Sequence, residues 1–145
     1  MKVILDANVI VSAAIQRGPS YRLVQRWLDV GDLEVVICPA LFAEAEDVLS
    51  RPRLHKRIDP VLAGLYLATI RRIAVFVDDP AAVESVTRDV KDDYLVALGR
   101  SHSVDAIVTG DKDLLEWDEQ RPPAVTPADF EAQLDDPDGR SGRLG

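Results

Sequence analysis

Short apolar runs alternate along the chain with segments whose apolar residues recur at helical spacing. Residues 2–5, 33–37, 74–77, 106–108 and 124–126 are rich in β-branched residues and are bounded by polar residues, Gly or Pro, which predicts five strands. Strands that alternate with helices are typical of a parallel sheet covered by helices. The pattern therefore predicts an α/β fold: a single three-layer α/β/α domain with a central, mainly parallel sheet of four to five strands.

Capping residues and prolines mark the predicted helices. The first helix is expected to be capped by Ser20 and to end at Gly31. Asp59 followed by Pro60 begins another, because Pro is favoured at the first helical position. The helical patterns cover residues 20–30, 39–51, 60–73, 92–101, 114–115 and 127–134. Residues 78–90 are expected to form a loop or a weak helix.

The two ends of the chain carry different signals. The opening residues are apolar, but Asp6 and Asn8 interrupt the run that a secretory signal needs. No segment approaches the run of ~18 apolar residues of a membrane helix, so we expect a cytoplasmic protein that does not enter the membrane. From Asp135 onward the sequence is nearly free of apolar residues. We therefore expect one folded domain over residues 1–134 and a disordered tail over residues 135–145.

Composition and charge narrow the function classes. The chain has 145 residues, of which 47% are hydrophobic, and its single cysteine, Cys38, excludes an intrachain disulfide. The net charge of −8 argues at first against nucleic acid, because phosphates are neutralised by Lys and Arg. The charge is uneven, however, since residues 1–72 hold ten Lys and Arg against eight Asp and Glu, and residues 73–145 hold seven against seventeen. The densest basic group is a candidate RNA contact or a solvated loop: Arg51, Arg53, Lys56 and Arg57.

Two aspartates follow predicted strands. Asp6 comes directly after residues 2–5, and Asp111 comes shortly after residues 106–108. The carboxyl ends of parallel strands share one edge of a sheet, and ligands bind there. A turn role next to Gly110 explains Asp111 alone equally well.

Two further acids share a helix face with apolar residues. Helical spacing places Glu44 with Leu41 and Ala45, and Asp92 with Leu95. A carboxylate that faces a core needs a cation, because burial of an unpaired charge is costly. The alternatives are a Glu44 side chain that reaches solvent and, for Asp92, a favourable interaction with the helix dipole.

The predicted topology gathers four acids at one rim: Asp6, Glu44, Asp92 and Asp111. Four anions repel one another unless protons or divalent cations compensate them, and oxygen ligands favour Mg²⁺ or Mn²⁺ over zinc. His55 and His102 lack the spacing of metal ligands. Because Mg²⁺ bound in this way retains waters and binds phosphate, the pattern indicates phosphodiester hydrolysis.

The chain resembles the PIN domain family over residues 1–134. The resemblance rests on VILDANVIVSA, ALFAEAEDVLSRPRL, KDDYLVALG and IVTGDKDLL in that order, with VTPADFEAQL as the closing strand and helix. It is most similar to the bacterial VapC-like group, the toxins of toxin–antitoxin systems. Where many relatives carry Ser at the end of the second strand, this chain has Cys38.

The resemblance implies a Mg²⁺-dependent endoribonuclease that cleaves RNA with a metal-activated water, and Mn²⁺ is expected to substitute. The implied metal ligands and catalytic residues are Asp6, Glu44, Asp92 and Asp111. The implied supporting residues are Asn8 and Thr109, which would orient the carboxylates by hydrogen bonds, and Asp93 and Asp113, which would assist the metal or its waters. The expected partners are the RNA substrate, a second copy of the chain in a homodimer, and a small antitoxin that presents a basic side chain to the acidic site.

Three other interpretations stay open. A phosphohydrolase similar to haloacid dehalogenases also begins with Asp after the first strand, but it needs a second Asp where this chain has Asn8. A phospho-receiver domain would use Asp78 as its phosphoacceptor, but it normally has an acidic pair where this chain has Leu5 and Asp6. The alternative outside the enzymes is a PIN fold that binds RNA or a protein without cutting.

Overall fold

Five short strands form one parallel sheet at the centre of the molecule. The computed structural model describes residues 1–81, 90–117 and 121–136, and of residues 90–93 it describes the backbone alone. The strands are β1 (Lys2–Leu5), β2 (Glu34–Ile37), β3 (Val75–Phe76), β4 (Ala106–Val108) and β5 (Ala124–Val125). Their order across the sheet is β3-β2-β1-β4-β5, and each of these pairings is parallel. The predicted α/β fold with a parallel sheet is confirmed.

The strand order of the sheet reverses its direction at β1. β2 and β3 extend it on one side, whereas β4 and β5 extend it on the other. Val3 of β1 accordingly pairs with Val35 on one flank and with Ala106 on the other. A crevice forms at such a switch point, because the loops that follow the two central strands leave in opposite directions. The residues that follow β1 and β4 are therefore the ones that border it.

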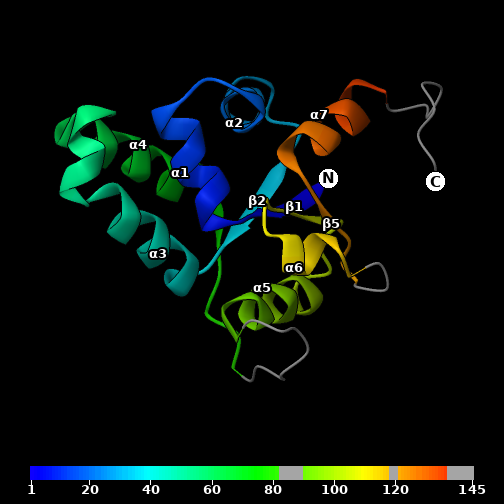
Figure 1. Cartoon of the computed structure of the whole chain (residues 1–145). Coiled ribbons are helices and arrows are strands. Elements are labelled where there is room, and N and C mark those ends of the chain that lie inside the picture. The colour runs from blue at the N-terminus through cyan, green and yellow to red at the C-terminus, as the bar shows by residue number, and fades with distance from the viewer. Residues whose placement is uncertain (82–89, 118–120, 137–145) are drawn as a thin grey trace.

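Helices cover both faces of the sheet and give the three layers. Figure 1 shows α1 (Ala7–Ile15), α2 (Pro19–Val30) and α7 (Pro127–Asp135) above the sheet, and α5 (Val90–Ser101) and α6 (Lys112–Leu115) below it. α3 (Pro39–Leu49) packs against α1, and α4 (Pro60–Ile73) packs against α3. Because helices cover both faces, Val3, Ile4 and Leu5 of β1 are 0% exposed.

The helix α1 lies where the sequence analysis predicts no element. Its residues include Val9, Ile10 and Val11, all of which are buried. A helix that is apolar on most of its surface shows no period of 3.6 residues, so its pattern cannot be told from that of a buried strand. Tyr66 of α4 fixes this helix from outside, since its hydroxyl donates to the Ile10 carbonyl at 2.7 Å.

Several predicted boundaries differ from those in the structure. The predicted cap Ser20 is wrong: α2 begins at Pro19, and Ser20 is its second residue. The predicted end at Gly31 is confirmed, because Gly31 adopts a left-handed conformation with φ of 72° after the helix. α7 includes Asp135, so the folded part of the chain reaches into the segment that was expected to be a tail.

Other predictions concern parts of the chain that the structure leaves out. The loop or weak helix expected before α5 includes residues 82–89, which lie outside the described residues, as do residues 137–145 of the expected tail. Within the described part of the chain, none of the helices has the length and apolar character to cross a membrane.

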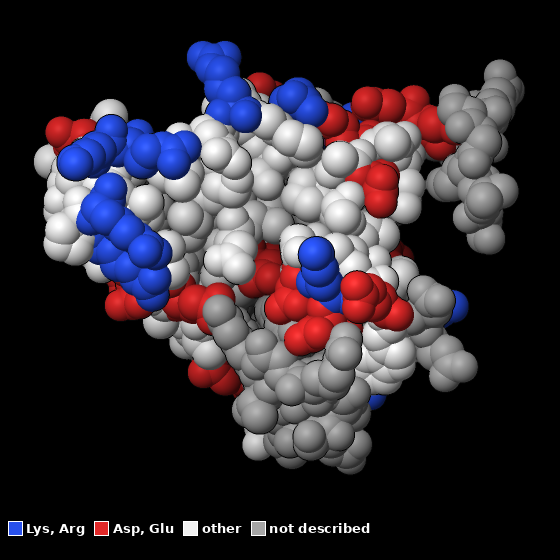
Figure 2. Space-filling view, in the orientation of Figure 1, with Lys and Arg blue, Asp and Glu red and all other residues white. Residues whose placement is uncertain are grey.

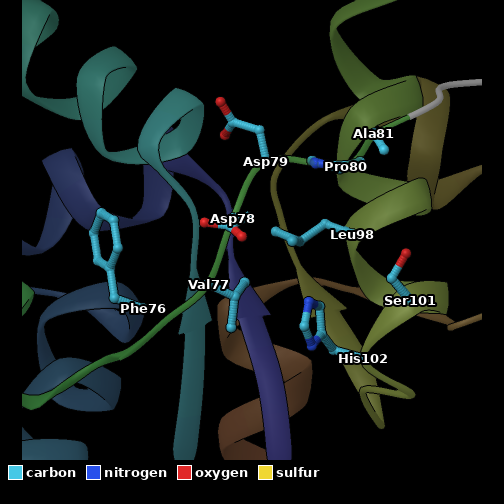
Figure 3. A pocket seen from close by; sticks show the side chains of 9 residues that line it. All are labelled: Phe76, Val77, Asp78, Asp79, Pro80, Ala81, Leu98, Ser101 and His102. Atoms are coloured by element: carbon cyan, nitrogen blue, oxygen red, sulfur yellow. The ribbon is translucent and has the colours of Figure 1, made fainter.

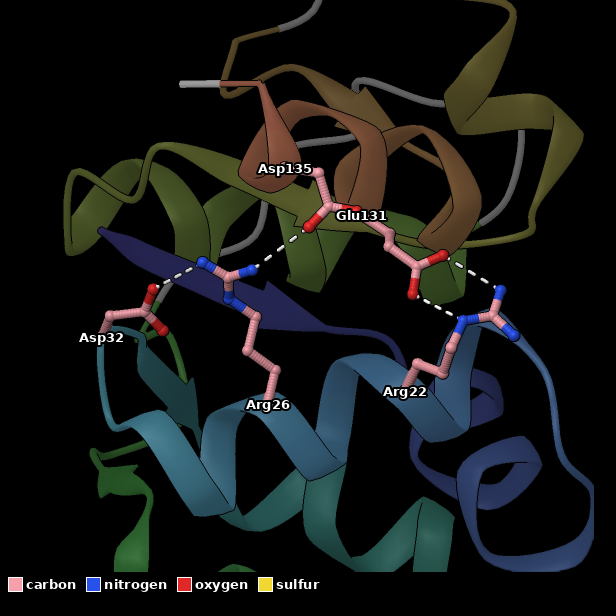
Figure 4. Close-up of polar contacts among 5 residues, drawn as sticks. All are labelled: Arg22, Arg26, Asp32, Glu131 and Asp135. Atoms are coloured by element: carbon pink, nitrogen blue, oxygen red, sulfur yellow. Dashed lines mark hydrogen bonds and ion pairs between the residues drawn. The ribbon is translucent and has the colours of Figure 1, made fainter. Parts of the chain in front are cut away.

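Ion pairs join α2 to α7 on the surface (Figure 4). Arg22 donates from Nε and Nη2 to both carboxylate oxygens of Glu131, at 2.6 and 3.0 Å. Arg26 contacts Asp32 at 2.9 Å and Asp135 at 3.4 Å. These pairs are largely exposed, and exposed pairs stabilise a fold only slightly. Their main consequence is positional, because Arg22 and Arg26 connect α2 to Glu131 and Asp135 of α7.

Candidate active site

Asp6 is held between β1 and α1 by its own backbone. Its N–H donates to the Val108 carbonyl of β4 at 2.9 Å, and its carbonyl accepts from Val9 and Ile10 at 2.9 and 3.1 Å. The residue is 4% exposed. Asp6 is thus both the continuation of β1 and the N-cap residue of α1, which places it at the switch point of the sheet.

Thr109 links Asp6 to the acids that follow β4. The Thr109 side chain is 0% exposed, and its hydroxyl donates to Asp6 Oδ2 at 2.8 Å. The same hydroxyl oxygen accepts the Asp111 N–H at 3.0 Å. Asp111 Oδ1 then accepts the Asp113 N–H at 2.8 Å and caps α6. We refer to Asp6, Thr109, Asp111 and Asp113 as the Thr109 network, which brings together residues from opposite sides of the switch point.

Tyr94 carries a buried hydroxyl in the same region. The hydroxyl oxygen has no hydrogen-bond partner among the described residues. Burial raises the pKa of Tyr94 well above its ordinary value of 10, and the charges of Glu44, Cys38, Asp6 and Asp79 raise the pKa further. The Tyr94 hydroxyl is therefore within the electrostatic range of both Asp6 and Glu44. Sequence reasoning missed Tyr94, although its place directly after Asp92 and Asp93 is the signal that would have found it.

Glu44 faces inward from α3, as its spacing predicts. The residue is only partly exposed, and its Oε2 atom is buried. The start of α3 is fixed by Asp79, whose Oδ1 accepts the Ala40 N–H at 2.8 Å. Cys38 occupies the N-cap position without a side-chain cap in the described structure, and burial raises the pKa of its thiol to about 11. Asp79, which follows β3 in the chain, therefore caps the N-terminus of α3 in place of the Cys38 side chain.

Of the remaining predicted site residues, Asn8, Asp92 and Asp93, the structure describes the side chain of Asn8 alone. Asn8 is exposed on the first turn of α1, and the described residues include no hydrogen bond from it to a carboxylate. Asp92 and Asp93 belong to the first turn of α5, but their side chains lie outside the described residues.

The predicted RNA-contacting group lies beyond the end of α3. Pro52–Lys56 form a short 3-10 helix, η1, and all four of the basic residues around it are exposed. Arg51 contacts Asp47 at 3.1 Å, whereas Arg57 donates to the Ile15 carbonyl at 3.3 Å and to Gln16 Oε1 at 3.4 Å. Arg57 therefore connects this basic group to the end of α1.

Acidic and basic side chains occupy different regions of the face drawn in Figure 2. Figure 2 shows Asp and Glu side chains around the hollow at its centre, with Lys and Arg side chains on the left and at the top. Within residues 1–81, 94–117 and 121–136, no three His, Cys, Asp or Glu side chains are close enough to form a metal centre by themselves. Asp6, Glu44 and Asp111 offer oxygen atoms only, which suits Mg²⁺ or Mn²⁺ rather than zinc.

A cavity next to β3 is lined by none of these carboxylates. It has a volume of about 510 Å³ and is bordered by the segment after β3 and by the second half of α5. Figure 3 shows the Asp79 carboxylate turned away from Leu98 and His102 on the α5 side. Since none of the Thr109 network lines this cavity, we do not place the chemistry there.

Comparison with known proteins agrees with this geometry. A family model described as PIN domain matches residues 2–113. The chain belongs to the PIN domain family. The match argues against the phosphohydrolase and receiver interpretations, and members of this family are generally nucleases. Among curated proteins, none matches this PIN domain in sequence.

Solved structures support the same fold. PAE2754 from Pyrobaculum aerophilum has a TM-score of 0.65 and 17% identity over 93% of this chain and 90% of its own. VapBC2 from Rickettsia felis, bound to a DNA fragment from its promoter, has a TM-score of 0.58 and 12% identity over 87% and 98%. The PIN domain of human SMG5 has a TM-score of 0.51 and 8% identity over 92% and 99%. At these identities the likeness shows the PIN fold alone.

Proposed function

We propose that this PIN domain is a metal-dependent endoribonuclease. The observation that carries the proposal is the Thr109 network, in which one buried hydroxyl joins Asp6 to the segment that holds Asp111. Glu44 faces the same region through Tyr94, and the resemblance adds Asp92 from the first turn of α5. Asn8, Asp93 and Asp113 remain proposed supporting residues.

The donor set fits a hard divalent cation. The candidate ligands Asp6, Glu44, Asp92 and Asp111 are all carboxylates, and Mg²⁺, with Mn²⁺ as its substitute, is the cation that such ligands favour. When bound, the metal would lower the pKa of a water and stabilise the leaving oxygen of a phosphodiester. The protein's own part is to fix the carboxylates, and the Thr109 hydroxyl does this for Asp6.

The test is cleavage of single-stranded RNA by the intact chain. Cleavage with Mg²⁺ or Mn²⁺ is expected to stop in EDTA. Asp6→Asn is expected to lower kcat/KM more than about 100-fold, because even the outer-shell partners of metal ligands contribute about 10–100-fold. Asp29→Asn, the same chemical change at an exposed acid on α2, is the matched control and should leave cleavage unchanged.

The outcomes separate the enzyme from its alternative. Equal cleavage by Asp6→Asn, Asp29→Asn and the unaltered chain would contradict the proposal. RNA binding without products, at every metal concentration, would instead indicate a non-cleaving binding module.

We further propose that the nuclease is the toxin of a toxin–antitoxin pair, acts in the cytoplasm and forms a homodimer. The support is the likeness to VapBC2, together with the acidic hollow, which a basic side chain of an antitoxin would complement. Induced expression should arrest growth, and Asp6→Asn should relieve the arrest. Sedimentation of the purified chain gives the oligomeric state, and a monomer at micromolar concentration would exclude the dimer.

A further inference from the structure

A second, smaller cavity lies where α1, α2 and α7 meet. It has a volume of about 240 Å³ and lies between the end of α1, the start of α2 and the start of α7. Thr126 at its edge follows Val125, whose carbonyl accepts the N–H of Thr109 at 2.9 Å. Thr126, at the edge of the cavity, is therefore the chain neighbour of the β5 residue that accepts a hydrogen bond from Thr109. We refer to it as the α2 pocket, and its main lining residues are Ser12, Arg17, Ser20, Tyr21, Thr126 and Pro127.

The start of α2 presents unused hydrogen-bond donors to this pocket. The helix has twelve residues and begins at Pro19, so the N–H groups of Ser20 and Tyr21 precede the first intrahelical bond. No side chain of the described residues caps this end. Gly18 before it has φ of 157° and ψ of −165°, a conformation that essentially only glycine adopts. Gly18 thus permits the turn that exposes these N–H groups.

Ser20 supplies an observation independent of the helix end. It is 9% exposed and lines the α2 pocket, yet its hydroxyl makes no hydrogen bond within the described structure. The other hydroxyls of the pocket are engaged: Ser12 Oγ accepts from Gln16 Nε2 at 3.2 Å, and Thr126 Oγ1 accepts from the Asp129 N–H at 3.0 Å. Water reaches this unpartnered hydroxyl, so a ligand in the pocket can replace water as its hydrogen-bond partner.

Arg17 is the charged residue that lines the α2 pocket. The Arg17 guanidinium lies 5.4 Å from the centre of the Tyr21 ring and forms no ion pair among the described residues. Arg57 reaches Gln16, the neighbour of Arg17, so the basic group at η1 extends to the same connection. Figure 2 shows Lys and Arg side chains over the α1–α2 connection. A site of N–H, hydroxyl and guanidinium donors, with positive charge, is selective for an oxyanion.

We propose that the α2 pocket binds a backbone phosphate of the RNA strand. This inference rests on the proposed ribonuclease function for the identity of the ligand. Arg17 and Ser20 are its binding residues, and they position the strand rather than take part in the chemistry. The pocket and the basic group at η1 then form one path along which the RNA backbone approaches the acidic hollow.

The first experiment tests the pocket without reference to cleavage. Inorganic phosphate is titrated into the intact, isotope-labelled chain, and the amide resonances are followed by NMR. The Ser20 and Tyr21 amides are expected to shift and saturate, and Ser20→Ala is expected to weaken the apparent affinity by about tenfold or more, as loss of one hydrogen bond to a charged group predicts. Ser20→Ala should not lower Tm, because the hydroxyl it removes has no partner in the described fold. Absence of a saturable shift would overturn the proposal, whether or not the chain is a nuclease.

The second experiment tests the ligand. Binding of a single-stranded RNA oligonucleotide is measured by fluorescence anisotropy in EDTA at several salt concentrations. Arg17→Gln should weaken binding and reduce the slope of log K against log salt by about 0.7, the value for one phosphate contact on a single strand. Arg72→Gln, at an exposed arginine of α4, is the matched control.

Each result decides between ligands. A smaller slope for Arg17→Gln than for Arg72→Gln supports the phosphate site. Equal slopes for the two variants, together with saturable phosphate binding, would show that the pocket takes another anion, such as an acidic segment of a partner protein, and would overturn the assignment to RNA. Failure of cleavage alone leaves both measurements intact, so it bears on the proposed function and not on the pocket.

Discussion

Replacement of Thr109 by Val tests whether one hydroxyl holds the candidate active site together. The two side chains have nearly the same shape, and Thr109 is 0% exposed, so the change removes the hydroxyl without opening a large cavity. Two hydrogen bonds are lost at once: the donation to Asp6 Oδ2 at 2.8 Å and the acceptance from the Asp111 N–H at 3.0 Å.

The two losses differ in size. A hydrogen bond to a charged group contributes about 1.5–3 kcal/mol, and a neutral one about 0.5–1.5 kcal/mol. Asp111 is only half-buried, so water can replace the acceptor of its N–H and the smaller value applies there. We therefore expect Thr109→Val to lower the free energy of unfolding by about 2–4 kcal/mol. For a chain of this length, this corresponds to a fall in Tm of about 6–12 °C.

Urea unfolding at neutral pH, followed by circular dichroism, measures the loss. Thr109→Ser is the matched control, because it retains the hydroxyl and removes a methyl group, and it should be clearly more stable than Thr109→Val. A Thr109→Val chain as stable as the unaltered one would refute the view that this hydroxyl fixes Asp6. The same result would weaken the case for a prearranged metal site.

Three further predictions concern groups whose surroundings the structure defines. Tyr94→Phe should leave Tm unchanged or higher, because it removes a buried hydroxyl without a described partner; a fall in Tm would show that the hydroxyl is structural. Arg22 lowers the pKa of Glu131 below its ordinary value of 4.5, so this pair stabilises the fold above that pH and loses its effect as the pH falls through the lower, folded value. The difference in unfolding free energy between the unaltered chain and Glu131→Gln should therefore be small at pH 7 and shrink as the pH falls below 4.5, and a difference that grows with acidity would contradict this. Cys38 is 0% exposed with a pKa raised to about 11, so iodoacetamide at pH 8 should alkylate it only after unfolding, and rapid labelling of the native chain would contradict its burial.

The strands and most helix boundaries could be predicted from the sequence because their signals are local. Residues 2–5 and 106–108 are exact matches to β1 and β4, and Gly31 ends α2 with the left-handed conformation that its position predicts. α1 could not be predicted, because a helix buried on most of its surface shows no amphipathic period. Ser20 was mistaken for a cap because Pro19, the true first residue, has the stronger preference for that position.

The candidate site likewise contains residues whose positions could be inferred from the sequence and residues whose positions could not. Asp6 and Asp111 follow strands, and a parallel sheet brings the ends of its strands to one edge, so their proximity could be inferred from topology. The inward direction of Glu44 could be inferred from helical spacing. The role of Asp79 at the start of α3 and the position of the Tyr94 hydroxyl depend on how β3 and α5 pack against α3, and no local pattern encodes that packing.

Binding of Mn²⁺ to the intact chain, measured by electron paramagnetic resonance of the free ion, tests the central claim most directly. The account predicts saturable binding that is unchanged in Asp29→Asn and at least about tenfold weaker in both Asp6→Asn and Asp111→Asn. Saturable binding with the same affinity in all three variants, or no saturable binding by the unaltered chain, would contradict it.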